Sequence, residues 1–447
     1  MRKLNIDKKN RKAEVALWGL FVMLLFLFYR RDIGNVEFSK MFFILPIIGC
    51  ALITPREFIV YLLALIMPLS FGLSTGYIFP IVLLIYFIKK HELPIKTVGF
   101  VLLIMLLEFV HYPFYDFEAE MDMSVLLNYF SAWFIAAYFI FNSDSKVDVD
   151  KFLFWFCIAT AVLCIFVSWH SLMIFDTTGY EMGEARVGTI GMKGDLEEGK
   201  IYLRANPNTL GYYSVTAISI LMLQIYRKRI NTWVAFGMIT LLVLTGGLTM
   251  SRTWLVLLAV NVIIFITSNN KKSLKTILFS GIILFMLAMI VFIAGDFFDL
   301  FIERFYGDKT MSGRTEILDF YNDALKNNLD VFFIGAGAIH YMDALHYDHA
   351  THNGIQQILV CYGVTGLILI ITPLIMRFKR LRRKMGGGIL YFLPIFTVVV
   401  FLQTIQSIIP QQLMFPLIPA YLILTLNKKN CNGRATLTDK PRYHQLE

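Results

Sequence analysis

Apolar runs long enough to cross a membrane alternate with polar connections along the whole chain. A spanning helix needs about 20 mostly apolar residues, with a range of about 17–25. The pattern therefore predicts an all-α, polytopic integral membrane protein with about 12–14 transmembrane helices. The candidate helices run roughly over residues 13–29, 38–54, 57–73, 75–88, 94–110, 124–141, 152–175, 207–226, 232–249, 252–268, 276–294, 352–376, 389–407 and 409–426.

Composition supports this class and excludes several others. Of the 447 residues, 57% are apolar and only 16% are charged, against roughly 25% charged in an ordinary soluble domain. These values exclude a cytosolic enzyme, a disordered chain and a secreted disulfide scaffold. The first apolar run is followed by Tyr29-Arg30-Arg31 rather than by a small-residue cleavage site, so we expect it to be retained as a helix. The five Cys lack metal-ligand spacing and are interpreted as core thiols.

The net charge of +9 is interpreted through the positive-inside rule rather than through nucleic-acid binding. Basic residues are concentrated in alternate connections, which predicts that both termini are cytoplasmic. The strongest inner markers are Arg227-Lys228-Arg229 and the basic run from Arg377 to Lys384.

Two outer connections are long, and long loops often carry function. The segment Asp319 to Asn327 within the second loop reads as a short helix, which predicts a small helical extracytoplasmic subdomain. The predicted organisation is N-terminal transmembrane helices over 1–175, an extracytoplasmic loop over 176–206, a core over 207–376 with the large loop 295–351, and C-terminal helices with a basic tail over 377–447.

Four of the eight histidines lie in or next to the second loop: His340, His346, His349 and His352. Their spacing suits a metal such as zinc, but the loop lacks Cys and matches no zinc motif, so no metal site is predicted. His352 differs because it stands at the start of an apolar helix. There the helix dipole disfavours the protonated imidazole, and a neutral imidazole is a usable general base. The alternative is that His352 only caps the helix.

Several arginines remain on the predicted outer side, where Lys and Arg are usually scarce: Arg186, Arg204, Arg252, Arg304 and Arg314. Arg252 stands between two apolar runs, where a guanidinium is costly unless it faces a partner or a water-filled cavity. Arg also suits a bidentate grip on phosphate oxygens. The alternative is that these side chains snorkel to the membrane surface.

Other polar features are weaker. Asn206-Pro207-Asn208 predicts a turn and a helix start, and Gly335-Ala336-Gly337 predicts a tight turn. Glu108 lies at the outer end of its span and is expected to reach water. The chain has no P-loop, dinucleotide fingerprint or HExxH motif. Nucleotide-driven chemistry is therefore not expected, and no cofactor is predicted.

The stretch from about Arg204 to Gly366 resembles the O-antigen ligase and O-antigen polymerase membrane glycosyltransferases. Four elements carry the resemblance in the family's order, each at the predicted outer side. They are Asn206-Pro207-Asn208-Thr209-Leu210-Gly211, Ser251-Arg252-Thr253, Ser312-Gly313-Arg314-Thr315-Glu316 with Phe333-Ile334-Gly335-Ala336-Gly337, and His352-Asn353 with Gly363-Val364-Thr365-Gly366.

The resemblance implies an enzyme of the bacterial inner membrane that transfers a glycan from a polyprenyl diphosphate to an acceptor hydroxyl. It implies catalytic roles for Arg252, Arg314 and His352, with Arg186, Arg204, Asn208 and Asn353 in substrate binding. The expected function is polymerisation of lipid-linked oligosaccharide repeats for a surface polysaccharide such as O-antigen or capsule.

A ligase that moves the finished glycan to a lipid A core shares the same motifs and stays open as an alternative. A flippase for the lipid-linked glycan is the rival from another class, but the chain lacks repeated halves and midplane charges. The implied partners are the polyprenyl-diphosphate-linked oligosaccharide, an acceptor glycan, membrane lipids, a chain-length regulator and a flippase, with no nucleic acid.

Overall fold

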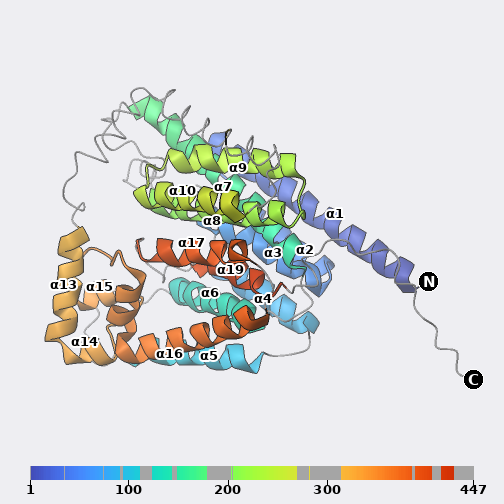
Figure 1. Ribbon diagram of the computed structural model, residues 1–447. Coiled ribbons are helices and arrows are strands. Elements are labelled where there is room, and N and C mark those ends of the chain that lie inside the picture. The colour runs from blue at the N-terminus through green and yellow to red at the C-terminus, as the bar shows by residue number, and fades with distance from the viewer. Residues whose placement is uncertain are drawn as a thin grey trace, which may run out of the picture.

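A computed structural model describes residues 2–34, 36–73, 75–90, 94–110, 123–142, 148–178, 203, 205–268, 281, 314–384, 388–404 and 414–426, and these ranges contain helices and connections but no strand. Figure 1 shows the helices packed as a bundle. The helices are α1 (Arg2–Phe28), η1 (Tyr29–Ile33), α2 (Met41–Ile53), α3 (Arg56–Leu69), η2 (Ser70–Gly72), α4 (Thr75–Lys90), α5 (Ile95–Phe109), α6 (Met123–Phe141), α7 (Val149–Thr178), α8 (Pro207–Tyr226), α9 (Thr232–Gly247), α10 (Arg252–Ser268), α13 (Arg314–Asn327), α14 (Leu329–Phe333), α15 (Tyr341–Ala344), α16 (Gly354–Lys384), η7 (Ile389–Tyr391), α17 (Leu393–Leu402) and α19 (Leu417–Ile423).

The all-α, polytopic class predicted from the apolar pattern is confirmed. Four helices of the described ranges are long and apolar enough to cross a membrane, at Asn10–Ile33, Val149–Ser171, Pro207–Tyr226 and Gly354–Arg383. Further apolar helices of 10–17 residues occupy other predicted windows. The predicted helix within 319–327 is also present, as the second part of α13. The predicted window 276–294 lies outside the described residues, apart from residue 281.

Helix α8 forms the centre of the bundle. Of its 20 residues, the 17 that are buried include both polar and apolar side chains, and α7, α9, α10 and α17 pack around it. One of its polar side chains bonds to a neighbouring helix: the Ser214 hydroxyl donates to the Leu242 carbonyl (2.7 Å). A helix buried on nearly every side has no amphipathic pattern, which explains its uniformly mixed sequence.

One end of the bundle is defined by the start of α7, and we call it the Asp150 end. The Gln224 amide nitrogen, near the end of α8, donates to the Asp150 carbonyl (3.1 Å), so α7 and α8 run antiparallel. The Asp148 N–H donates to the Tyr61 hydroxyl (3.2 Å), which brings the first half of α3 to the same end.

Lysines at the end of α4 extend this end to α3 and α6. The Lys89 ammonium donates to the Thr54 carbonyl, just before α3 (2.5 Å). The Lys90 ammonium donates to the Tyr138 hydroxyl, in the last turn of α6 (3.3 Å). The start of α3 and the ends of α4 and α6 therefore share the Asp150 end.

Helix α16 begins at the opposite end, which we call the His352 end. The Arg377 guanidinium, late in α16, donates to the Ile140 carbonyl at the end of α6 (2.8 Å), so the first turn of α16 is remote from the Asp150 end. Figure 1 shows α13, α14 and α15 gathered around that first turn, opposite the N-terminus of α1. These three helices form the small helical subdomain.

Candidate active site

The Asn-Pro-Asn element starts α8 and lies against the Ser-Arg-Thr element. The Asn206 side-chain oxygen accepts from the Asn208 N–H (2.9 Å) and caps the helix, with Pro207 at its first position. A Cβ at Gly211 would lie 3.3 Å from both the Thr249 hydroxyl and the Trp254 Cβ. Two elements 40 residues apart in the chain therefore meet at one corner of the His352 end.

Arg252 is the first residue of α10 at this corner, and it is exposed. The neighbouring Ser251 is buried, and Met250 has a left-handed backbone (φ 49°) that makes the turn from α9 tight. The N-termini of α8 and α10 both lie here. Helix N-termini carry partial positive charge, so together with the Arg252 guanidinium they favour an anion.

A glycine turn fits into a break in α16. Gly335 and Gly337 have left-handed backbones (φ 85° and 83°), as does Gly363 inside α16 (φ 63°). A Cβ at Gly335 would lie 2.3 Å from the Cys361 carbonyl carbon, and one at Gly363 would lie 2.3 Å from that of Phe333. The backbones therefore touch. These glycines are needed for the close packing of the turn against α16. Their role is therefore structural, and the turn is not a phosphate-binding loop.

Glu108 holds this turn in place, so the expectation that it reaches water is wrong. The side chain is fully buried. Its two oxygens accept from the N–H groups of Ala338 and Ile339, at 3.0 Å each, and one also accepts from the Tyr362 hydroxyl (3.0 Å). The Tyr362 hydroxyl bonds in turn to Tyr129 of α6. The signal in the sequence was an ionisable residue inside an apolar run, which marks a partner by default.

We expect Glu108→Gln to destabilise the protein by about 1–3 kcal/mol, because the amide –NH₂ cannot accept and leaves a buried backbone N–H unpaired. The measurement is thermal unfolding of the purified protein in detergent. Glu57→Gln is the matched control, since Glu57 is half-exposed on α3 and pairs with its chain neighbour Arg56 (3.1 Å). Equal unfolding temperatures for both variants would contradict a clamping role.

His352 lies two residues before α16 and is held neutral. Burial first, and then electrostatic interaction with Arg314 and His349, lower its pKa from 6.5 to about 4. Its Nδ1 is buried and makes no hydrogen bond with any residue that the structure describes. The imidazole is therefore unprotonated at neutral pH, and the causes are burial and neighbouring groups rather than the helix-start position. Arg314, the first residue of α13, therefore acts electrostatically on the imidazole.

The subdomain is fixed to the start of α16 by polar contacts. The Gln356 amide nitrogen donates to the Leu318 carbonyl (2.9 Å) and to the Asn322 side-chain oxygen (3.2 Å), both on α13. The Tyr321 hydroxyl donates to the His349 carbonyl (2.6 Å). These bonds set the position of Arg314 relative to His352.

The helix cap at this point belongs to Asn353 rather than to His352. The Asn353 side-chain oxygen accepts from the N–H groups of Ile355 (3.0 Å) and Gln356 (3.1 Å). This is a standard N-cap pattern. The capping alternative for His352 is therefore not supported. The oxygen of Asn353, predicted to bind substrate, is already engaged by the backbone.

Two of the other loop histidines have partners within the protein. His340 Nδ1 lies 3.3 Å from Asp343 Oδ2, and the ring of His349 packs edge-on against Tyr347. Among the described residues, no group of three His, Cys, Asp or Glu side chains is placed to hold a metal ion.

Three of the predicted outer arginines cannot be placed. Arg186, Arg204 and Arg304 lie outside the described residues, as do Ser312 and Gly313. The residues beside Arg204, Leu203 and Ala205, are buried. The structure thus brings Arg252, Arg314, His352, Asn208 and Asn353 to the same end of the bundle, at the starts of α8, α10, α13 and α16.

Comparison with known proteins supports the resemblance. Residues 236–371 match the family model Wzy_C, described as O-antigen ligase. This range contains the Ser-Arg-Thr, Gly-Ala-Gly and His-Asn elements and excludes the Asn-Pro-Asn element. No curated protein and no solved structure matches the chain. Members of the family are membrane enzymes that transfer glycans in O-antigen ligation or polymerisation. The chain is therefore a polytopic membrane protein with a Wzy_C O-antigen ligase family domain over residues 236–371.

Proposed function

We propose that the protein polymerises lipid-linked oligosaccharide repeats of a surface polysaccharide. The donor is a glycan on a polyprenyl diphosphate, and the acceptor is a sugar hydroxyl. The observation that carries the proposal is the unprotonated His352 at the start of α16, within the field of Arg314. A neutral base beside fixed cations suits a reaction in which a hydroxyl loses a proton and a diphosphate leaves.

The reaction needs no other reactant. The acceptor oxygen attacks the anomeric carbon of the donor sugar, and the bond from that carbon to the diphosphate oxygen breaks. The hydroxyl proton passes to the His352 imidazole, and the bond electrons leave with the polyprenyl diphosphate. Arg252 and Arg314 stabilise the charge that develops on its oxygens. His352 then releases its proton to water.

The distribution of basic residues supports an orientation with both termini in the cytoplasm. Cations gather at the Asp150 end, and fewer lie at the His352 end, as the positive-inside rule requires when the Asp150 end is cytoplasmic. The described cations at the Asp150 end include Arg56, Lys89, Lys90, Lys96, Lys151, Arg227, Lys228, Arg229, Arg377, Lys379, Arg380, Arg382 and Arg383. The site then faces the outer leaflet of the bacterial inner membrane, where the lipid-linked donor is presented.

The second candidate is a ligase that moves a finished glycan to a lipid A core or another acceptor. It is favoured by the printed description of the family model, O-antigen ligase. The same base and the same arginines serve either reaction, because the leaving group is identical and only the acceptor differs.

A gel of surface and lipid-linked glycans from a deletion strain separates these functions. For a polymerase, we expect single repeat units on the final acceptor, with long chains restored by the wild-type gene. Long chains stranded on the polyprenyl lipid would instead establish the ligase. Lipid-linked single units held in the inner leaflet would contradict both enzyme functions and establish a flippase.

A further inference from the structure

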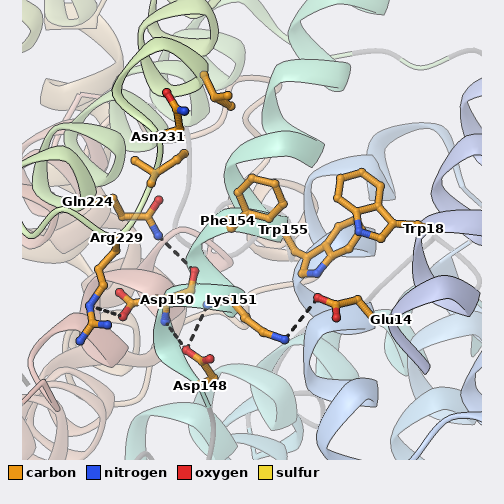
Figure 2. A pocket seen from close by; sticks show the side chains of 12 residues that line it. Glu14, Trp18, Asp148, Asp150, Lys151, Phe154, Trp155, Gln224, Arg229 and Asn231 are labelled. Carbon is orange, nitrogen blue, oxygen red and sulfur yellow. Dashed lines mark hydrogen bonds and ion pairs between the residues drawn. The ribbon is translucent and has the colours of Figure 1, made fainter. Parts of the chain in front are cut away.

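A second site lies at the Asp150 end, remote from His352. A cavity of about 550 Å³ lies between α1, α7, the end of α8 and the start of α9, and Figure 2 shows the side chains around it. Trp18, Phe154 and Trp155 form an aromatic wall, with the two indole rings 4.6 Å apart. This volume is within the range of about 300–1,000 Å³ that is typical of small-ligand sites. None of its lining residues takes part in the proposed reaction.

The cavity contains a buried acceptor without a donor. Gln224 is only 2% exposed, and its Oε1 has no hydrogen-bond partner among the described residues. The orientation of the amide is fixed, because its Nε2 donates to the Asp150 carbonyl (3.1 Å), which can only accept. Figure 2 shows this bond and the opposite placement of the amide oxygen. A buried acceptor of this kind is costly unless a ligand or water donates to it.

The charges around the cavity leave one acid without a cation. Lys151 pairs with Glu14 (3.3 Å), and Asp150 pairs both with Arg227 and with Arg229 (3.3 Å to Arg229). The Asp148 carboxylate accepts only the N–H groups that start α7, and it forms no ion pair with a residue that the structure describes. The buried Gln224 Oε1 and the exposed Asp148 carboxylate are therefore the acceptors that the cavity offers a ligand, and aromatic rings beside them favour a cation.

The cavity also lies where a membrane surface would be. The apolar spans of α1 and α7 begin at Asn10 and Val149, so Glu14, Trp18 and Trp155 lie four to eight residues after those starts. Tryptophan is enriched at this depth. Val234, on the cavity wall, is 50% exposed, which suits contact with acyl chains.

We propose that this cavity binds the headgroup of a phospholipid that carries a primary ammonium, such as phosphatidylethanolamine. The ammonium donates to Gln224 Oε1 and to the Asp148 carboxylate, beside the aromatic wall. The lipid phosphate faces the half-exposed cations Lys151 and Arg229. The acyl chains pass along Val234 into the bilayer.

Native mass spectrometry of the full-length protein in detergent tests this site. Phosphatidylethanolamine and phosphatidylcholine with the same acyl chains are titrated separately, because the choline headgroup keeps the charge but has no N–H donor. We expect phosphatidylethanolamine to bind about tenfold more tightly, which corresponds to one charge-assisted hydrogen bond. We expect Gln224→Met to remove most of this preference. Glu57→Gln, a half-exposed acid outside the cavity, should keep it.

Asp148→Asn is the second variant, used if Gln224→Met fails to fold. It keeps a side-chain oxygen for the N–H groups that start α7 but removes the charge that accepts from the ammonium, so it should reduce the preference. Equal binding of the two lipids, or an unchanged preference in both cavity variants, would overturn the proposal. So would tighter binding of phosphatidylglycerol, which would make this an anionic-lipid site. Competition by soluble glycerophosphoethanolamine at the same concentration would show that the cavity binds the free headgroup, which would contradict a lipid as its ligand. Each outcome is independent of the glycan transfer proposed above.

Discussion

The His352→Ala protein is expected to insert normally and to lose glycan transfer. Positioned general-base catalysis is commonly worth about 10²–10⁴ in rate, and we expect a loss of that size. The measurement is the initial rate of purified, reconstituted protein with a polyprenyl-diphosphate-linked repeat unit as donor and acceptor. The amount of protein in the membrane fraction is measured in parallel, so that lost activity and lost protein are separated.

The matched control for this variant is His346→Asn. His346 lies in the same loop, is exposed, and has a left-handed backbone that Asn tolerates (φ 52°). We expect it to keep nearly the full rate. A His352→Ala protein with full activity and normal insertion would remove the general base from the proposed reaction.

The pH profile gives this prediction a second readout. Because the pKa of His352 is lowered to about 4, the free enzyme keeps its base neutral as pH falls to about 5. The acid limb of kcat/KM, which reports the free enzyme, is expected near pH 4. In Arg314→Met the limb should move to higher pH, because removing a positive charge favours the protonated imidazole. This shift of the acid limb should be partial, because burial lowers the pKa of the imidazole more than the neighbouring charge does. A bound diphosphate acts in the same direction, so donor binding strengthens the base.

The helices were the predictable part of the molecule. Apolar runs of about 20 residues have few alternatives in a bilayer, since every backbone polar group must bond internally. The windows 207–226 and 252–268 match α8 and α10 closely. The helix predicted over 319–327 starts five residues later than α13 does, because the first turn of α13, at Arg314-Thr315-Glu316, has no apolar face of its own.

The position of the site at one end was also predictable, because the motif residues stand at the ends of apolar runs. The contacts between distant segments were not. Glu108 reaches a turn 230 residues later, and no local pattern encodes such a pairing. The same holds for Gly335 and Gly363, whose left-handed backbones allow their two segments to approach each other closely. Sequence spacing indicated a tight turn at Gly335 but not the break in α16 that receives it.

The Arg252→Lys protein is expected to fold and to lose about 10²–10³ in rate, by analogy with the loss of one donor to a developing oxyanion. Lysine keeps the charge but not the planar fork that grips two phosphate oxygens at once. The initial rate with the lipid-linked donor is the measurement, with Arg252→Ala beside it.

The geometry at the start of α10 is the reason to expect that a positive charge alone does not support the full rate. Arg252 follows the buried Ser251 and the left-handed Met250, and its corner is closed by Trp254 against Gly211. The side chain therefore extends from a fixed helix N-terminus, where its fork can be held in one orientation toward the diphosphate. Arg30→Lys is the control, since Arg30 is an exposed cation at the same end of the bundle, and its rate should not change. If Arg252→Lys is fully active while Arg252→Ala is not, the guanidinium acts as a point charge and the bidentate grip is wrong. If both are fully active, Arg252 only snorkels, and Arg314 alone would carry the leaving-group charge.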